Sequence, residues 1–130
     1  MARQSICRLS VILVLGLSVF GPLVDSSLWA GGGDPKKGEY WYREAGCANC
    51  HGKKGRGDGP SAATLNPKPA DYCTSTKHPT DAERLKMITG GGAGMGHSPD
   101  MPAWGEVLDQ QAVLDIIAYI HTLCPNIPKN

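Results

Sequence analysis

The most constraining feature of this chain is the sequence Cys47-Ala48-Asn49-Cys50-His51, a C-x-x-C-H pattern. Two cysteines separated by two residues on a tight turn can reach the two vinyl groups of one haem, and the next residue, His51, is then placed under the iron. His51 would bind the iron through Nε2, leaving its Nδ1–H to be oriented by a backbone carbonyl. The spacing therefore predicts one haem c, held by thioether bonds to Cys47 and Cys50.

Two other uses of a C-x-x-C pair compete with this interpretation. A structural zinc site needs a second pair of ligands, and none lies nearby at the usual spacing. A redox dithiol of the thioredoxin kind is expected in a βαβ setting, which this chain lacks. The haem interpretation is favoured over both.

Residues 1–30 have the order of a secretory signal peptide. Arg3 and Arg8 precede an apolar run, and a Gly-Pro break and Ala30 follow it. The run is shorter than the roughly 20 residues that span a bilayer, which favours cleavage after Ala30 over a retained membrane anchor. We therefore expect an exported, periplasmic domain of residues 31–130, which is tethered to the membrane only if the leader stays attached.

The charges of the predicted mature domain balance. The sequence has 13 Lys and Arg against 12 Asp and Glu, and the leader contains Arg3, Arg8 and Asp25. The formally neutral remainder has no general attraction to nucleic acid or to an anionic membrane. A domain of this size builds a modest core and often needs a cofactor or a covalent staple.

Capping signals predict a first and a last helix. Asp34 is a good N-cap and Pro35 suits the first helical position, so a helix is expected over residues 35–45. Asp109 can cap the last helix, which Pro125 ends. Its apolar stripe at helical spacing consists of Val113, Ile116, Ile117 and Ile120.

Between these helices the sequence is mostly loop. Residues 52–79 are rich in Gly, Pro, Asn and Lys and have no sustained apolar period. A loop of that length is unusual unless it wraps a ligand or carries a function. Thr80 and Glu83 then form a capping-box pattern, which predicts a short helix over residues 81–89.

Several further stretches carry a family resemblance. In chain order they are Gly38-x-x-x-Tyr42 before CANCHG, Gly57-Asp58-Gly59-Pro60, Pro67-Lys68-Pro69-Ala70-Asp71-Tyr72, Met101-Pro102-Ala103-Trp104-Gly105 and Ile117-Ala118-Tyr119-Ile120. With these stretches the chain resembles the class I c-type cytochromes, small soluble monohaem proteins. The resemblance implies an all-α, cytochrome c-like fold, with three to four helices and long loops wrapped round one covalently bound haem.

The resemblance also implies the second axial ligand of the iron. In that family the methionine of the M-P-x-W-G stretch is the distal ligand, so Met101 is expected to bind the iron together with His51. A soft thioether favours Fe(II) and raises the reduction potential. Met95 is the alternative ligand, Met101 could instead fill core space, and His78 or His97 could give a bis-histidine haem.

Other roles are carried over by the same resemblance. The carbonyl of Pro60 is expected to accept from His51 Nδ1, and Trp104 to meet a haem propionate. Tyr72 is expected beside the cofactor, with turn and core packing as the alternative for all three.

Packing positions follow as well. Gly38 and Tyr42 are expected where the first helix crosses the last, with Tyr119 opposite. The helix pattern itself, rather than the resemblance, indicates that Met87 is a core residue and that His121, four residues after Ile117, lies on or near the buried edge of the last helix.

Two cysteines remain after the haem motif and the leader are assigned. Cys73 and Cys124 form a pair in an oxidising compartment, so a disulfide is predicted, with two buried free thiols as the alternative. Cys7 would leave with the signal peptide.

These assignments predict a one-electron carrier. With both axial positions filled, the iron has no open site, and no general base, nucleophile or metal cluster supports catalysis, so the chain is not expected to be an enzyme. Redox proteins such as reductase and oxidase complexes or other cytochromes are the expected partners, met by a monomer or by a subunit of a respiratory complex. Lys53, Lys54, Arg56 and Lys68 could border the docking face, or could be a solvated loop.

Two alternatives of other classes remain. One is a haem-based sensor, in which Met101 dissociates to admit a small ligand. The other is a membrane-tethered electron-transfer subunit of a larger oxidoreductase.

Overall fold

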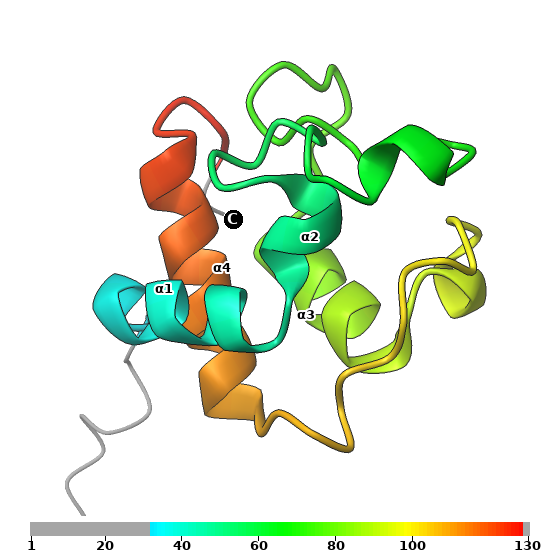
Figure 1. Cartoon of the computed structure of the whole chain (residues 1–130). Helices are drawn as coiled ribbons and strands as arrows, with labels where there is room; N and C mark the ends of the chain where they lie inside the picture. The colour runs from blue at the N-terminus through cyan, green and yellow to red at the C-terminus, as the bar shows by residue number, and fades with distance from the viewer. Residues whose placement is uncertain (1–31, 129–130) are drawn as a thin grey trace, which may run out of the picture. The chain divides into compact units, whose positions relative to one another are not determined.

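The computed structural model describes residues 32–128, and within that range it contains α-helices and short 3₁₀ turns but no β-strand. The predicted signal peptide lies outside the described residues. None of the helices that the structure describes is long and apolar enough to cross a membrane. The elements, shown in Figure 1, are α1 (Pro35–Glu44), α2 (Cys47–His51), η2 (Ala62–Thr64), α3 (Asp81–Gly90), η3 (Ala93–Met95) and α4 (Gln110–Leu123).

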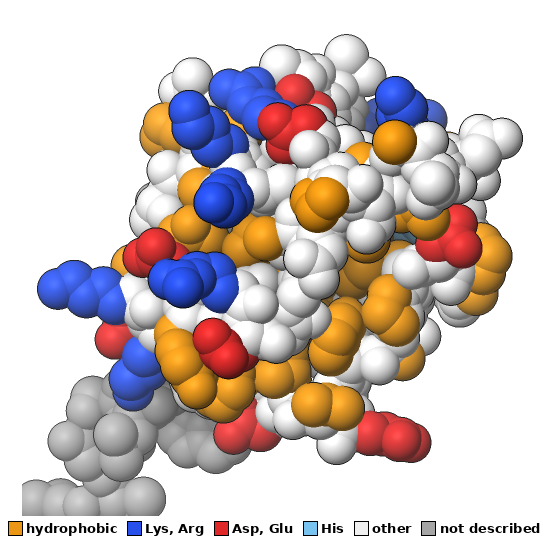
Figure 2. Space-filling view, viewed as in Figure 1, with side chains coloured by type: hydrophobic (Ala, Val, Ile, Leu, Met, Phe, Trp, Pro, Cys, Tyr) orange, Lys and Arg blue, Asp and Glu red, His pale blue; other side chains and the backbone are white. Residues whose placement is uncertain are grey.

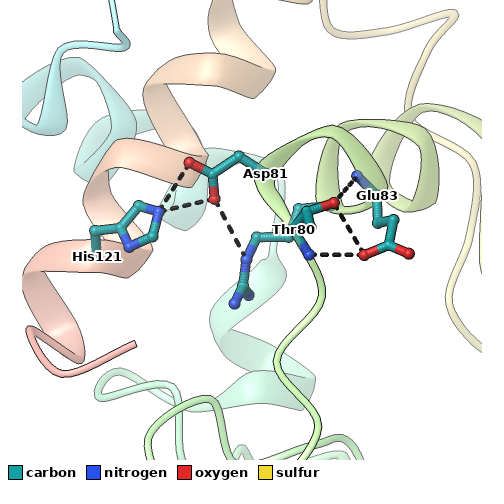
Figure 3. Close-up of polar contacts among 5 residues, drawn as sticks. Thr80, Asp81, Glu83 and His121 are labelled. Carbon is teal, nitrogen blue, oxygen red and sulfur yellow. Dashed lines mark hydrogen bonds and ion pairs between the residues drawn. The ribbon is translucent and has the colours of Figure 1, made fainter. Parts of the chain in front are cut away.

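Side-chain caps set where the three longer helices begin. The carboxylate of Asp34 accepts from a backbone N–H two residues on at 2.9 Å, and that of Asp109 from one three residues on at 2.7 Å. Thr80 and Glu83 form the full capping box, in which each side chain accepts from the backbone N–H of the other (Figure 3). Each cap satisfies a donor that the first helical turn leaves free, so all three predicted helix starts are confirmed.

The core forms where α1 lies across α4 (Figure 1). Gly38 lets the two backbones touch, because a Cβ at this position would collide with the carbonyl of Asp115. One helical turn after Gly38, the ring of Tyr42 on α1 meets the ring of Tyr119 on α4 edge to face, with centroids 5.4 Å apart. The predicted stripe of α4 faces this core and is fully buried: Val113, Ile116, Ile117 and Ile120.

The long loop between α2 and α3 contains η2 and is otherwise irregular, as its composition predicts. Backbone bonds hold it in place, among them one from Tyr72 N to the Gly55 carbonyl at 2.8 Å. Cys73 and Cys124 are joined in a disulfide with their Cα atoms 5.0 Å apart, which links this loop to the end of α4.

Candidate functional site

The whole C-x-x-C-H sequence lies on one short helix, α2. This helix sits between two glycines with positive φ, Gly46 at 75° and Gly52 at 77°, so the chain turns sharply at both ends. The side chains of Cys47, Cys50 and His51 line one cavity, and both cysteines are free thiols. The local turn therefore brings two sulfurs and an imidazole to the same wall.

The cavity has a volume of about 400 Å³ and mostly apolar walls. Its lining comes from all four α-helices (α1, α2, α3 and α4), the long loop and the segment that follows η3. An apolar cavity of this kind, with two thiols and an imidazole on its wall, fits a haem held by thioether bonds. Within residues 32–128 no group of three or more His, Cys, Asp or Glu side chains is gathered as a zinc site would require.

His51 is held in a form that can bind a metal. Burial lowers the pKa of its imidazole to about 4, although the Ala70 carbonyl raises it in part. At neutral pH the ring is therefore uncharged, which is the form that coordinates metals. The ring stacks on Tyr72 with centroids 4.8 Å apart, and Tyr72 lines the same cavity.

The expected hydrogen bond between His51 and Pro60 is not formed. The Nδ1 atom of His51 is buried without a hydrogen-bond partner, and Pro60 is exposed and does not line the cavity. The reason is the position of the ring, which stacks on Tyr72 and has the carbonyl of Ala70 as its backbone neighbour.

Met101 and Met95, the two methionine candidates for the iron, lie in different places. Met101 is half-buried and lines the cavity, whereas Met95 is 37% exposed and does not. Backbone bonds fix Met101 on both sides: its N–H donates to the Ser98 carbonyl at 3.2 Å, and its carbonyl accepts from Gly92 N at 3.0 Å. The structure thus brings Met101, but not Met95, into the cavity with His51.

The remaining candidates also reach the cavity or its rim. Trp104 lines it and donates from its backbone to the Ile88 carbonyl at 2.9 Å, next to the end of α3. His78 is half-buried and His97 exposed, and both contribute to the lining. Met87, expected as a core residue, is half-buried and faces the cavity, while His121 is buried on α4 as expected.

The cavity wall includes Arg84, a charged residue to which the sequence analysis gave no role. Arg84 is only 6% exposed and lines the cavity from α3. It stands four residues before the buried Ile88 and three before Met87, so all three share one helical face. This spacing was the signal in the sequence that could have identified Arg84. It was easy to overlook, because α3 is short and half of its residues are polar or charged.

Comparison with known proteins decides the family. A family model described as "Cytochrome C oxidase, cbb3-type, subunit III" matches residues 33–120, which is more than half of the chain. The chain belongs to this family. It is a c-type cytochrome domain, an electron-transfer protein with covalently bound haem c, and Cys47, Cys50 and His51 match the attachment motif.

The fold of this cytochrome domain also occurs in a solved structure. It is similar to a chain of the reducing HAO-like protein complex of Kuenenia stuttgartiensis, with a TM-score of 0.60 and 21% sequence identity. The similarity covers 77% of this cytochrome and 49% of that chain, so this cytochrome spans about half of its length. At this identity the likeness shows the fold alone. No curated protein sequence matches the cytochrome.

Proposed function

We propose that this cytochrome is an exported one-electron carrier whose haem iron is bound by His51 and Met101. The observation that carries the proposal is that Met101 shares the cavity with the imidazole and both thiols and is fixed by backbone bonds on each side. With the Met101 thioether and the His51 imidazole as its protein ligands, the haem iron would have no open site for a substrate. The bound haem supplies the Fe(II)/Fe(III) couple, and the chain excludes water from it and sets its potential.

Electrons then pass to and from protein partners at the surface. Lys and Arg side chains gather on the left of the face shown in Figure 2, and Lys53, Lys54 and Arg56 are exposed directly after the haem motif. Such a local patch can steer an acidic redox partner although the domain has no net charge. The family is named for an oxidase subunit and the solved neighbour comes from a redox complex, which supports a partner of this kind.

Carbon monoxide binding separates the carrier from the sensor. We expect the ferrous wild-type protein to keep its absorption spectrum when carbon monoxide is added, because Met101 closes the sixth position. The Met101→Ala variant should bind the gas at once and change colour. Prompt binding by the wild type would show an open or readily opened iron, and the haem-based sensor would then replace the carrier.

A further inference from the structure

Arg84 is a buried cation without sufficient partners. Its side chain is 6% exposed and forms part of the cavity wall, yet its Nε and Nη2 atoms are buried and make no hydrogen bond. A buried guanidinium with one long ion-pair contact and two nitrogens without hydrogen bonds is costly, because the charge loses more hydration than its partners replace. An anion bound in the cavity next to the Arg84 guanidinium would stabilise this buried charge.

Asp81 does not meet this need. Its Oδ1 lies 3.6 Å from Arg84 Nε, which is too long for a hydrogen bond. The same carboxylate is already engaged by His121 on α4, whose Nε2 lies 2.8 Å from Oδ1 and 3.1 Å from Oδ2 (Figure 3). Asp81 thus belongs mainly to the contact between α3 and α4.

The charged and titratable groups that act on Arg84 come from three elements. Asp81 lies on α3, the same helix as Arg84, and Tyr72 lies on the long loop. His121, on α4, contacts Asp81 and so acts on Arg84 only indirectly. Burial lowers the pKa of the Arg84 guanidinium, while Asp81 and Tyr72 raise it. Asp81 is therefore the only carboxylate among the described groups that act on Arg84, and its geometry is poor.

Haem c brings anions into this cavity, because each macrocycle carries two propionate carboxylates. We propose that Arg84 binds one of these propionates through its unpaired nitrogens and keeps it ionised. A guanidinium presents two parallel N–H groups that match the two oxygens of a carboxylate, and this pairing is strongest away from water. The inference rests on the covalent haem of the proposed carrier. Arg84 would be a positioning residue, which orients that haem and neutralises the charge of one propionate.

The proposal predicts a change in how the reduction potential depends on pH. In the wild type the paired propionate stays ionised, so it adds no pH dependence to the potential between about pH 5 and about pH 9. Any slope in that range then comes from the other titratable groups that line the cavity, among them His78 and His97, and is shared by every variant. In Arg84→Met this propionate loses its buried guanidinium, so it should take up a proton when the haem is reduced. The potential should then fall as pH rises, and at alkaline pH it should lie below that of the wild type, because a buried positive charge has been removed.

Matched variants separate this role from a structural one. Lys86→Met removes an exposed charge from the same helix and should behave like the wild type. Asp81→Asn removes the alternative partner and should keep the pH dependence of the wild-type potential. If Asp81→Asn reproduces the effect of Arg84→Met, the ion pair and not the propionate is responsible, and the proposal is wrong.

Spectroscopy gives a readout that does not depend on electron-transfer activity. The infrared difference spectrum between the reduced and oxidised Arg84→Met protein should show the C=O band of a protonated carboxylic acid, which the wild type lacks. If Arg84→Met does not accumulate, Arg84→Lys can be used instead. This variant keeps the positive charge but loses the two parallel N–H groups of the guanidinium, so the propionate bending mode in its resonance Raman spectrum should shift. Variants that match the wild type in potential, infrared and Raman spectra would overturn the proposal. A pyridine haemochrome spectrum without covalent haem would instead overturn the proposed function.

Discussion

At the scale of single residues, Gly38 shows how one missing side chain fixes the packing of two helices. A Cβ at this position would overlap the backbone of Asp115, and the next atom it would meet is the Cβ of Tyr119, 2.9 Å away. We expect Gly38→Ala to lower the free energy of unfolding by about 2 kcal/mol or more, because α1 and α4 must move apart. Urea titration of the haem-loaded protein measures this.

Gly90 is the matched control for Gly38. It is also a helical glycine with an ordinary φ, but a Cβ there meets no atom within 4 Å. Gly90→Ala should therefore raise the free energy of unfolding by about 0.5–1 kcal/mol, since alanine has less freedom to lose on folding. Equal effects of the two substitutions would contradict the close contact between α1 and α4.

Residues also mark the limit of what the sequence could predict. Asp34, Thr80 and Asp109 were predictable as caps, because a cap depends on neighbours a few residues away. The exposed Pro60 and the buried Arg84 were not, since their environments are set by the position of the His51 ring and by the face that α3 turns to the cavity. Such features depend on contacts between segments far apart in the sequence.

At the scale of elements, the loop between α2 and α3 is held to α4 by the link between Cys73 and Cys124, which are 51 residues apart. We expect the double variant Cys73→Ser/Cys124→Ser to be less stable by about 4 kcal/mol, because the unfolded chain regains the freedom that the closed loop removes. Denaturant unfolding with and without reductant measures the difference.

Reduction of the wild type should lower its stability to the level of the double variant and leave the variant unchanged. The haem spectrum should stay the same in both, since neither cysteine belongs to the attachment motif. Stability that does not respond to reductant, together with free thiols on alkylation, would show two unpaired cysteines instead.

At the scale of the whole molecule, the order of elements was predictable because each carries its own local signal. The capping residues and the apolar stripe of α4 located three helices, and the C-x-x-C-H sequence located the cofactor. The shape of the cavity was not predictable, because α2, α3, α4, the long loop and the segment around Met101 all contribute to it. The family resemblance favoured Met101 over Met95, and the cavity supports that preference because Met101 lines it and Met95 does not.

The most direct test of the carrier is the absorption spectrum of the oxidised protein, read at the weak far-red band of methionine-bound ferric haem. We predict that the wild type and Met95→Ala show this band and that Met101→Ala loses it while its haem stays covalently attached. A wild type without the band, or a band that survives in Met101→Ala, would contradict ligation by Met101 and with it the closed iron on which the proposed function rests.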